Sequence, residues 1–297
     1  MSHMESVSRP AKLSFFKILR SEWIKLFTLR STWWILAATV VANIGICLAI
    51  AAGVRWTETY VHSNPGAVHG GPTTIEPGSM GLLSSLVAQG CGFIGQLVFI
   101  ILSILIITNE YSSGMIRSTL TVAPRRGKVL TAKVLVVAFL AIIVFGVSVA
   151  ASWAGGYAIL RDSIGVDLTL TSATSVRILA GFVAEMVLIA LLCFGLGALI
   201  RSTGGSIGAA IGVVLILPMI VSLIVGIFSR SEAEPTGWRK WLNDGAQFLP
   251  TTAGGLVTQE TIPDTSILGP WEGLGVLGGW ALLSLIIAYI VTARRDV

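Results

Sequence analysis

The chain has 297 residues, of which 54% are hydrophobic and only 12% are charged, with a net charge of +5. A soluble globular protein carries roughly 25% charged residues, so this chain has too little charge to cover a water-exposed surface. Together with the mean hydropathy of +0.84, these values exclude a soluble enzyme, a disordered chain and an ordinary nucleic-acid-binding protein.

The N-terminal region contains a tail and one amphipathic segment. Residues 1–11 are expected to be a tail, and their opening Met-Ser-His-Met resembles a cloning remnant. In residues 12–31 large apolar side chains recur every three or four positions, which predicts a helix that lies in the inner membrane interface. Its apolar face carries Phe16, Leu19, Trp23 and Phe27, and Lys25 lies on the opposite, basic face. The segment fits either a plain anchor or an elbow helix that also docks a cytoplasmic partner.

Six apolar stretches are long enough to cross a bilayer, which takes about 20 helical residues. They are residues 33–54, 82–108, 134–160, 178–200, 207–228 and 273–292. None contains Asp, Lys or Arg, and one contains a single Glu. We therefore predict an all-α, six-span transmembrane domain over 33–292, with an outer segment at 229–272 and a cytoplasmic tail at 293–297. The first stretch is too long for the core of a cleaved signal peptide.

The distribution of charge predicts the orientation. With the N-terminus inside, the inner segments hold 14 of the 20 Lys and Arg and four of the 15 acids, while the outer segments hold ten acids. Positive residues favour the cytoplasmic side, so both termini are expected inside. The net positive charge is then explained by topology and anionic lipid, with no nucleic acid involved.

The inner loop between the second and third spans, residues 109–128, is basic. A lone basic loop would be an ordinary result of topology. Here, however, a Glu-x-x-x-Gly-x-x-Arg run is followed by a turn predicted at Pro124 and Gly127, and then by Lys133.

This order resembles the permease subunits of ABC-2 type transporters. In that family a glutamate, a Gly-Thr-Ile-Arg-like run, a proline followed by basic residues, and a lysine join the second and third spans. The matching residues here are Glu110, Gly114, Ile116, Arg117, Pro124, Arg125, Arg126 and Lys133. Met115 replaces the usual threonine. The segments 21–34 and 249–254 are similar to actinobacterial members.

The resemblance implies a bacterial plasma-membrane half-transporter, in which two six-span permease units pair with two ATPase subunits. The inner loop would be a coupling helix seated on the ATPase. The coupling residues would be Glu110, Tyr111, Gly114, Arg117, Arg125 and Arg126, whose charges suit an acidic partner surface. ATP and magnesium would be bound by the ATPase, and the permease chain itself would bind no cofactor. The second permease subunit would form a homodimer or a heterodimer.

The chain lacks the Gly-x-x-x-x-Gly-Lys-Ser/Thr loop that binds ATP phosphates. It is therefore expected to be a transport subunit without enzyme activity of its own. Two other classes stay open: an ion-coupled secondary transporter and a non-transporting scaffold or sensor subunit. Ion-coupled carriers usually place several ionisable groups in the membrane, and Glu185 is the single one here.

Polar groups within the spans are candidates for a substrate path or for hydrogen bonds between helices. They are Asn43, Gln89, Gln96 and Glu185, together with Pro218, which is expected to kink its helix. Gly204, Gly208 and Gly212 predict a close-packing ridge, with a dimer interface as one use. We expect no metal site, because His62 and His69 lack nearby acids arranged as ligands. The mostly apolar spans favour an amphipathic or hydrophobic substrate, such as a drug, an antibiotic peptide or a lipid-like molecule.

Overall fold

The computed structural model describes residues 15–28, 30–64, 81–112, 126–161, 172–228, 237–262 and 266–294. The regular elements in these ranges are helices. They are α1 (Phe15–Thr28), α2 (Arg30–Ser63), α3 (Leu82–Ser112), α5 (Arg126–Leu160), α6 (Ala173–Ile200), α7 (Thr203–Ile211), the π-helix η1 (Gly212–Ile216), α8 (Leu217–Phe228), α9 (Trp238–Ala246), α10 (Pro250–Gly255), the 3-10 helix η2 (Leu256–Thr258) and α11 (Pro270–Arg294).

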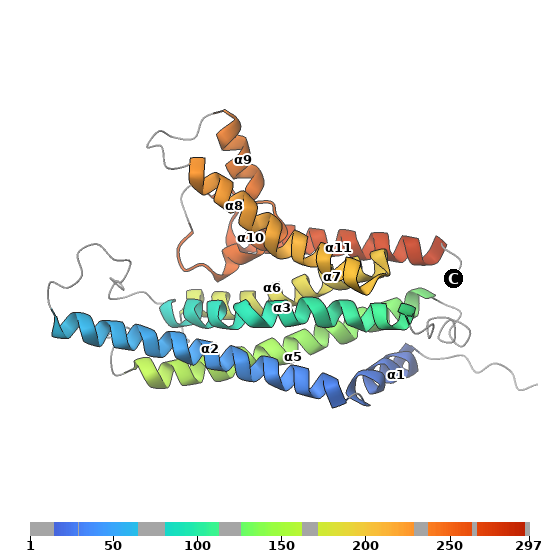
Figure 1. Ribbon diagram of the computed structural model, residues 1–297, viewed down its shortest axis with the longest axis horizontal. Helices are drawn as coiled ribbons and strands as arrows, with labels where there is room; N and C mark the ends of the chain where they lie inside the picture. The colour runs from blue at the N-terminus through green and yellow to red at the C-terminus, as the bar shows by residue number, and fades with distance from the viewer. Residues whose placement is uncertain are drawn as a thin grey trace, which may run out of the picture.

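The predicted all-α membrane fold is confirmed. Five stretches are long and apolar enough to cross a membrane, within α2, α5, α6, the α7–α8 unit and α11. A sixth is the bent helix α3, whose two halves, Leu82–Gly92 and Ile94–Asn109, meet at 44°. Figure 1 shows α1 and the C-terminal end of α11 at the same end of the bundle, as an even number of spans requires.

The helices extend beyond the apolar runs that predicted them. The turn expected at Gly127 is wrong, because α5 already begins at Arg126. Gly127 is instead a packing position, since a Cβ there would lie 2.5 Å from the Tyr289 ring of α11. The N-terminal end of α6 likewise lies five residues before the predicted span, where the Ser172 hydroxyl accepts a hydrogen bond from the Ser175 backbone N–H.

The core of the bundle surrounds α6, which packs against α3, α5 and α11. The rings of Phe99 and Phe145 lie 4.7 Å apart, and Phe145 meets Phe182 of α6 at 5.8 Å. On the other side, α2 packs against α3 and α5. The closest backbone approach between α2 and α3 is at Gly90, where a Cβ would lie 2.9 Å from the Cα of Cys47. Small residues therefore set the helix spacing here, as is common in membranes.

The fifth span is interrupted in its middle. Pro218 has no N–H, so the carbonyl of Val214, four residues earlier, loses its usual helical donor. The chain forms the π-helix η1 at this point, and the hydroxyl of Thr251 donates to the Val214 carbonyl at 2.8 Å. Figure 1 shows α8 and α9 projecting away from the bundle beyond this break.

The described part of the outer segment includes two short helices, α9 and α10. The first, α9, carries the exposed Trp238 and Trp241, which is typical of a helix at the membrane interface. Pro250 lies at the first position of α10, where proline is well tolerated. The α10–η2 unit packs on α6 and α11, and Arg177 of α6 donates to the Gln259 carbonyl at 2.8 Å.

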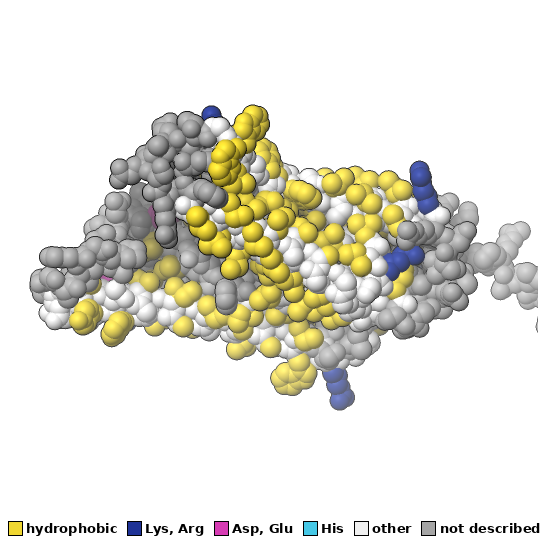
Figure 2. Space-filling view, turned by 45° about the horizontal axis from the view of Figure 1, so that its top comes forward, with side chains coloured by type: hydrophobic (Ala, Val, Ile, Leu, Met, Phe, Trp, Pro, Cys, Tyr) yellow, Lys and Arg dark blue, Asp and Glu magenta, His cyan; other side chains and the backbone are white. Residues whose placement is uncertain are grey.

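The surface agrees with a membrane setting. In Figure 2, apolar side chains cover the flank of the bundle, and most of the visible Lys and Arg lie toward the end that carries the C-terminus. That end is the one assigned to the inner side by the charge distribution.

Candidate coupling interface at the inner end

The predicted coupling loop lies largely outside the described residues. Gly114, Arg117 and Arg125 fall there entirely. Glu110 lies in the last turns of α3 and Arg126 opens α5, but their side chains are not among those described. The structure thus places both ends of the loop at the inner end of the bundle.

Tyr111, the one coupling candidate whose side chain is described, pairs with an arginine that the sequence did not single out. The guanidinium of Arg201 lies over the Tyr111 ring, 5.0 Å from its centroid. Arg201 ends α6 in the left-handed conformation, with φ of 59°, and its backbone N–H donates to the carbonyl of Gly197. Its Nε and Nη2 are buried and have no hydrogen-bond partner among the described residues. Arg201 is therefore a partly buried cation at the inner end, held against the Tyr111 ring.

The elbow helix α1 packs on α5, and its most buried residues are not those of the predicted apolar face. Phe16, predicted to be on the apolar face, is 76% exposed, while Ile18 and Glu22 are the buried residues of this helix. Leu19, Trp23 and Phe27 are half-buried, as is Lys25. The apolar face toward the membrane interface stays a prediction, and Ile18 and Glu22 add a contact with the bundle that the sequence did not single out.

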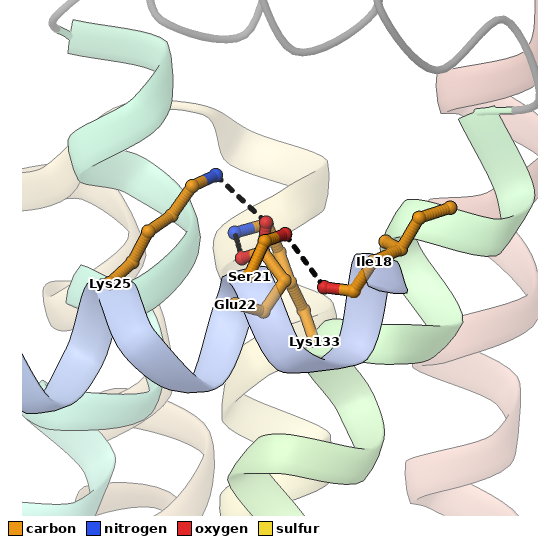
Figure 3. Close-up of polar contacts among 5 residues, drawn as sticks. All are labelled: Ile18, Ser21, Glu22, Lys25 and Lys133. Carbon is orange, nitrogen blue, oxygen red and sulfur yellow. Dashed lines mark hydrogen bonds and ion pairs between the residues drawn. The ribbon is translucent and has the colours of Figure 1, made fainter. Parts of the chain in front are cut away.

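Glu22 is buried because it lies between two ammonium groups (Figure 3). One carboxylate oxygen pairs with Lys133 of α5, and the other accepts from Lys25 of α1 at 2.8 Å. Glu22 is 4% exposed and Lys133 is 3% exposed. Burial alone would raise the pKa of Glu22, but the two lysines, chiefly Lys133, outweigh it and hold this pKa below its ordinary value. The carboxylate is therefore ionised at neutral pH.

Sequence reasoning missed the partnership of Glu22 and Lys133. Lys133 was read as the lysine that opens the third span, and Glu22 as one of a few inner acids. One signal was available: a lysine at the very edge of an apolar span needs a neutralising partner. The partner could not be chosen, because Glu22 lies 111 residues earlier in the chain.

The candidates for a substrate path do not meet at one place. Asn43 of α2 is fully buried between α3 and α5, where it donates to Ser148 at 3.4 Å. Glu185 of α6 is 7% exposed and lies against Gly254 of α10. On α3, Gln89 is exposed and Gln96 half-buried. The Asn43 contact is an interhelical hydrogen bond, one of the two roles that the sequence left open.

The glycine ridge of the fifth span faces away from the part of the chain that the structure describes. A Cβ added at Gly204, Gly208 or Gly212 would meet no atom of the described residues within 4 Å. The expected tight packing of these glycines is therefore not made by the described residues of the same chain.

Metal-binding side chains do not cluster in the part of the chain that the structure describes. His69 and the side chain of His62 lie outside that part. Cys47, Cys91 and Cys193 are free and buried.

The fold and the basic inner end define an all-helical membrane protein that crosses the bilayer several times. A comparison with protein families then gives its family: the model of the ABC-2 family transporter proteins matches residues 16–297. The chain belongs to this family and is a permease component of an ABC transporter. Family membership implies pairing with an ATPase subunit in general. A search of curated proteins finds no match.

Proposed function

We propose that this chain is the permease subunit of a bacterial plasma-membrane ABC exporter. A separate ATPase, which binds ATP and magnesium, drives alternating access in a pair of permease subunits. The cargo is amphipathic or hydrophobic. The observation that carries the proposal is the family match over residues 16–297. This sequence contains no Gly-x-x-x-x-Gly-Lys-Ser/Thr loop, so the proposal assigns ATP binding to a separate subunit.

The arrangement of helices at the inner end supports the proposal that the ATPase binds there. α3 ends and α5 begins there, on either side of the predicted coupling loop. The loop itself carries Arg117, Arg125 and Arg126. Their charge is of the sign that complements an acidic groove on a partner protein.

The first test is whether an ATPase that co-purifies with this chain hydrolyses ATP in response to it. Glu110→Lys or Gly114→Trp is expected to lower permease-dependent ATP hydrolysis at least about tenfold, because each change puts a wrong charge or a bulky ring into the predicted contact. Insertion into the membrane should be unaffected. Lys240→Glu, a charge reversal on the outer helix α9, is the matched control and should couple normally.

Two results would contradict the proposal. Normal coupling in both loop variants would remove the coupling role from residues 109–128. Transport by the purified chain alone, driven by an ion gradient without ATP, would place it among the secondary transporters.

A further inference from the structure

Helix α1 is joined to α2 through residue 29, yet it packs mainly on α5. Near its start, Ile18 forms a small buried cluster with Val129 and Ala132 of α5. Near its end, the ring of Trp23 meets Phe139 of α5, with centroids 5.2 Å apart. α1 therefore bridges the inner ends of the first and third spans.

The ion pair of Glu22 and Lys133 lies between these two apolar contacts (Figure 3). Apolar contacts alone allow one helix to slide along another with little penalty. A buried ion pair does not, because moving one charge along the helix gives up its contact with the other in an apolar setting. The pair thus determines where along α5 the helix α1 is held.

Side-chain contacts also join the end of α1 to the start of α2. The indole N–H of Trp33, near the start of α2, donates to the Phe27 carbonyl of α1 at 3.1 Å. The Phe27 and Trp33 rings lie 4.9 Å apart. A movement of α1 is therefore passed to the start of α2.

We propose that Glu22 and Lys133 are positioning residues for energy coupling. Their ion pair locks α1 onto α5, so that a displacement of the 109–128 loop, which continues directly into α5, carries α1 and the start of α2 with it. This role rests on the proposed function, since it needs an ATPase that acts at the loop. The locking of α1 onto α5 is a property of the permease alone.

Three variants separate charge from position: Glu22→Met, Lys133→Met and the double variant. Glu22→Met removes the carboxylate that pairs with the buried Lys133. Lys133→Met is milder, because Lys25 still pairs with Glu22 at 2.8 Å. In the double variant two apolar side chains of similar length replace the pair. Such replacements are commonly neutral or stabilising for the fold, but the charged contact that sets the position of α1 is gone. Lys17→Gln, on the exposed face of α1, is the matched control.

The first measurement follows α1 without any ATPase. Spin labels are placed at the exposed positions Arg20 and Thr131, in a full-length chain with its three cysteines replaced by alanine. We expect the distance distribution in lipid to broaden strongly for Glu22→Met and less for Lys133→Met. It should stay broad in the double variant, which has no charged pair to set the position of α1 along α5.

The second measurement is ATP hydrolysis by the complex in proteoliposomes, normalised to the amount of assembled complex. Coupling should fall at least about tenfold for Glu22→Met, by less for Lys133→Met, and stay low in the double variant. Melting temperature and complex yield report a merely structural role. They should fall far less than the coupling does.

Three outcomes would overturn the inference. In the first, the single variants couple normally. In the second, they lose coupling while the label distance is unchanged. In the third, the double variant keeps a narrow label distance and couples normally, which would mean that apolar packing alone holds α1. If no ATPase responds to the unsubstituted chain, the proposed function fails instead, and the distance measurement still decides whether the pair holds α1.

Discussion

Individual glycines in this bundle fall into two groups, distinguished by what a Cβ would meet. Gly90 belongs to the packed group, because the atoms in its way are backbone and Cβ atoms of Cys47 on the neighbouring helix. Gly45 belongs to the open group, with no atom within 4 Å. Backbone cannot move aside as the end of a flexible side chain can, so the two positions are expected to respond oppositely to alanine.

We expect Gly90→Ala to destabilise the protein by about 1–3 kcal/mol, the usual effect of overpacking. Gly45→Ala is the control and should be neutral or slightly stabilising, because alanine favours the helix over glycine. Melting temperatures of the two variants in the same detergent measure the difference. Equal melting temperatures would mean that α2 and α3 approach each other less closely than the structure has them.

At the scale of elements, the fifth span depends on a contact from outside itself. The Val214 carbonyl, freed by Pro218, is satisfied by Thr251 of α10. Membrane helices tolerate proline when such a hydroxyl takes over the lost hydrogen bond. The outer helix α10 therefore stabilises the break from which α8 leaves the bundle.

Thr251→Val should cost about 1–2 kcal/mol, since it leaves a buried carbonyl unsatisfied. In a Pro218→Ala background the same change should cost much less, because residue 218 then supplies its own N–H. Thermal unfolding of the four proteins in this cycle measures the coupling between the two sites. Thr252→Val, the neighbouring threonine in α10, is the control. Additive effects in the cycle would refute the link.

The element scale is also where prediction from sequence worked best and where its limit is clear. Long apolar runs identified the spanning helices because the bilayer requires both their length and their composition. They could not locate helix ends such as Arg126, since a helix continues into the interface wherever its backbone bonds remain satisfied. The contact of α1 with α5 was not predicted, because Glu22 becomes compatible with burial only through Lys133, a contact that has no local signature.

At the scale of the whole molecule, one chain leaves surfaces that it does not cover itself. The stretch Thr203–Ile227 is the least buried of the five straight candidate spans. Its open glycines Gly204, Gly208 and Gly212 form a ridge that lets a second helix approach closely. The proposed function requires a second permease chain, and we expect that chain to pack on this ridge.

Gly208→Leu is expected to weaken dimerisation of the permease at least about tenfold, because the side chain fills the ridge. Gly53→Leu, at an equally open position on α2, is the control and should leave the dimer intact. Single-molecule photobleaching of labelled protein in liposomes counts the subunits. Equal dimer fractions in both variants would remove the ridge from the interface.

The separation of Glu22 from Lys133 has a consequence for the biogenesis of the protein. The two residues are 111 positions apart, which corresponds to roughly 6–22 s of synthesis at typical elongation rates of about 5–20 residues per second. Until the third span emerges, the nascent α1 has no docking surface, and Lys25 is the nearest counter-charge for its carboxylate. During this interval we expect α1 to lie on the lipid headgroups with its Phe16 side toward the lipid. Phe16 is still exposed in the finished protein, which allows the same contact with lipid.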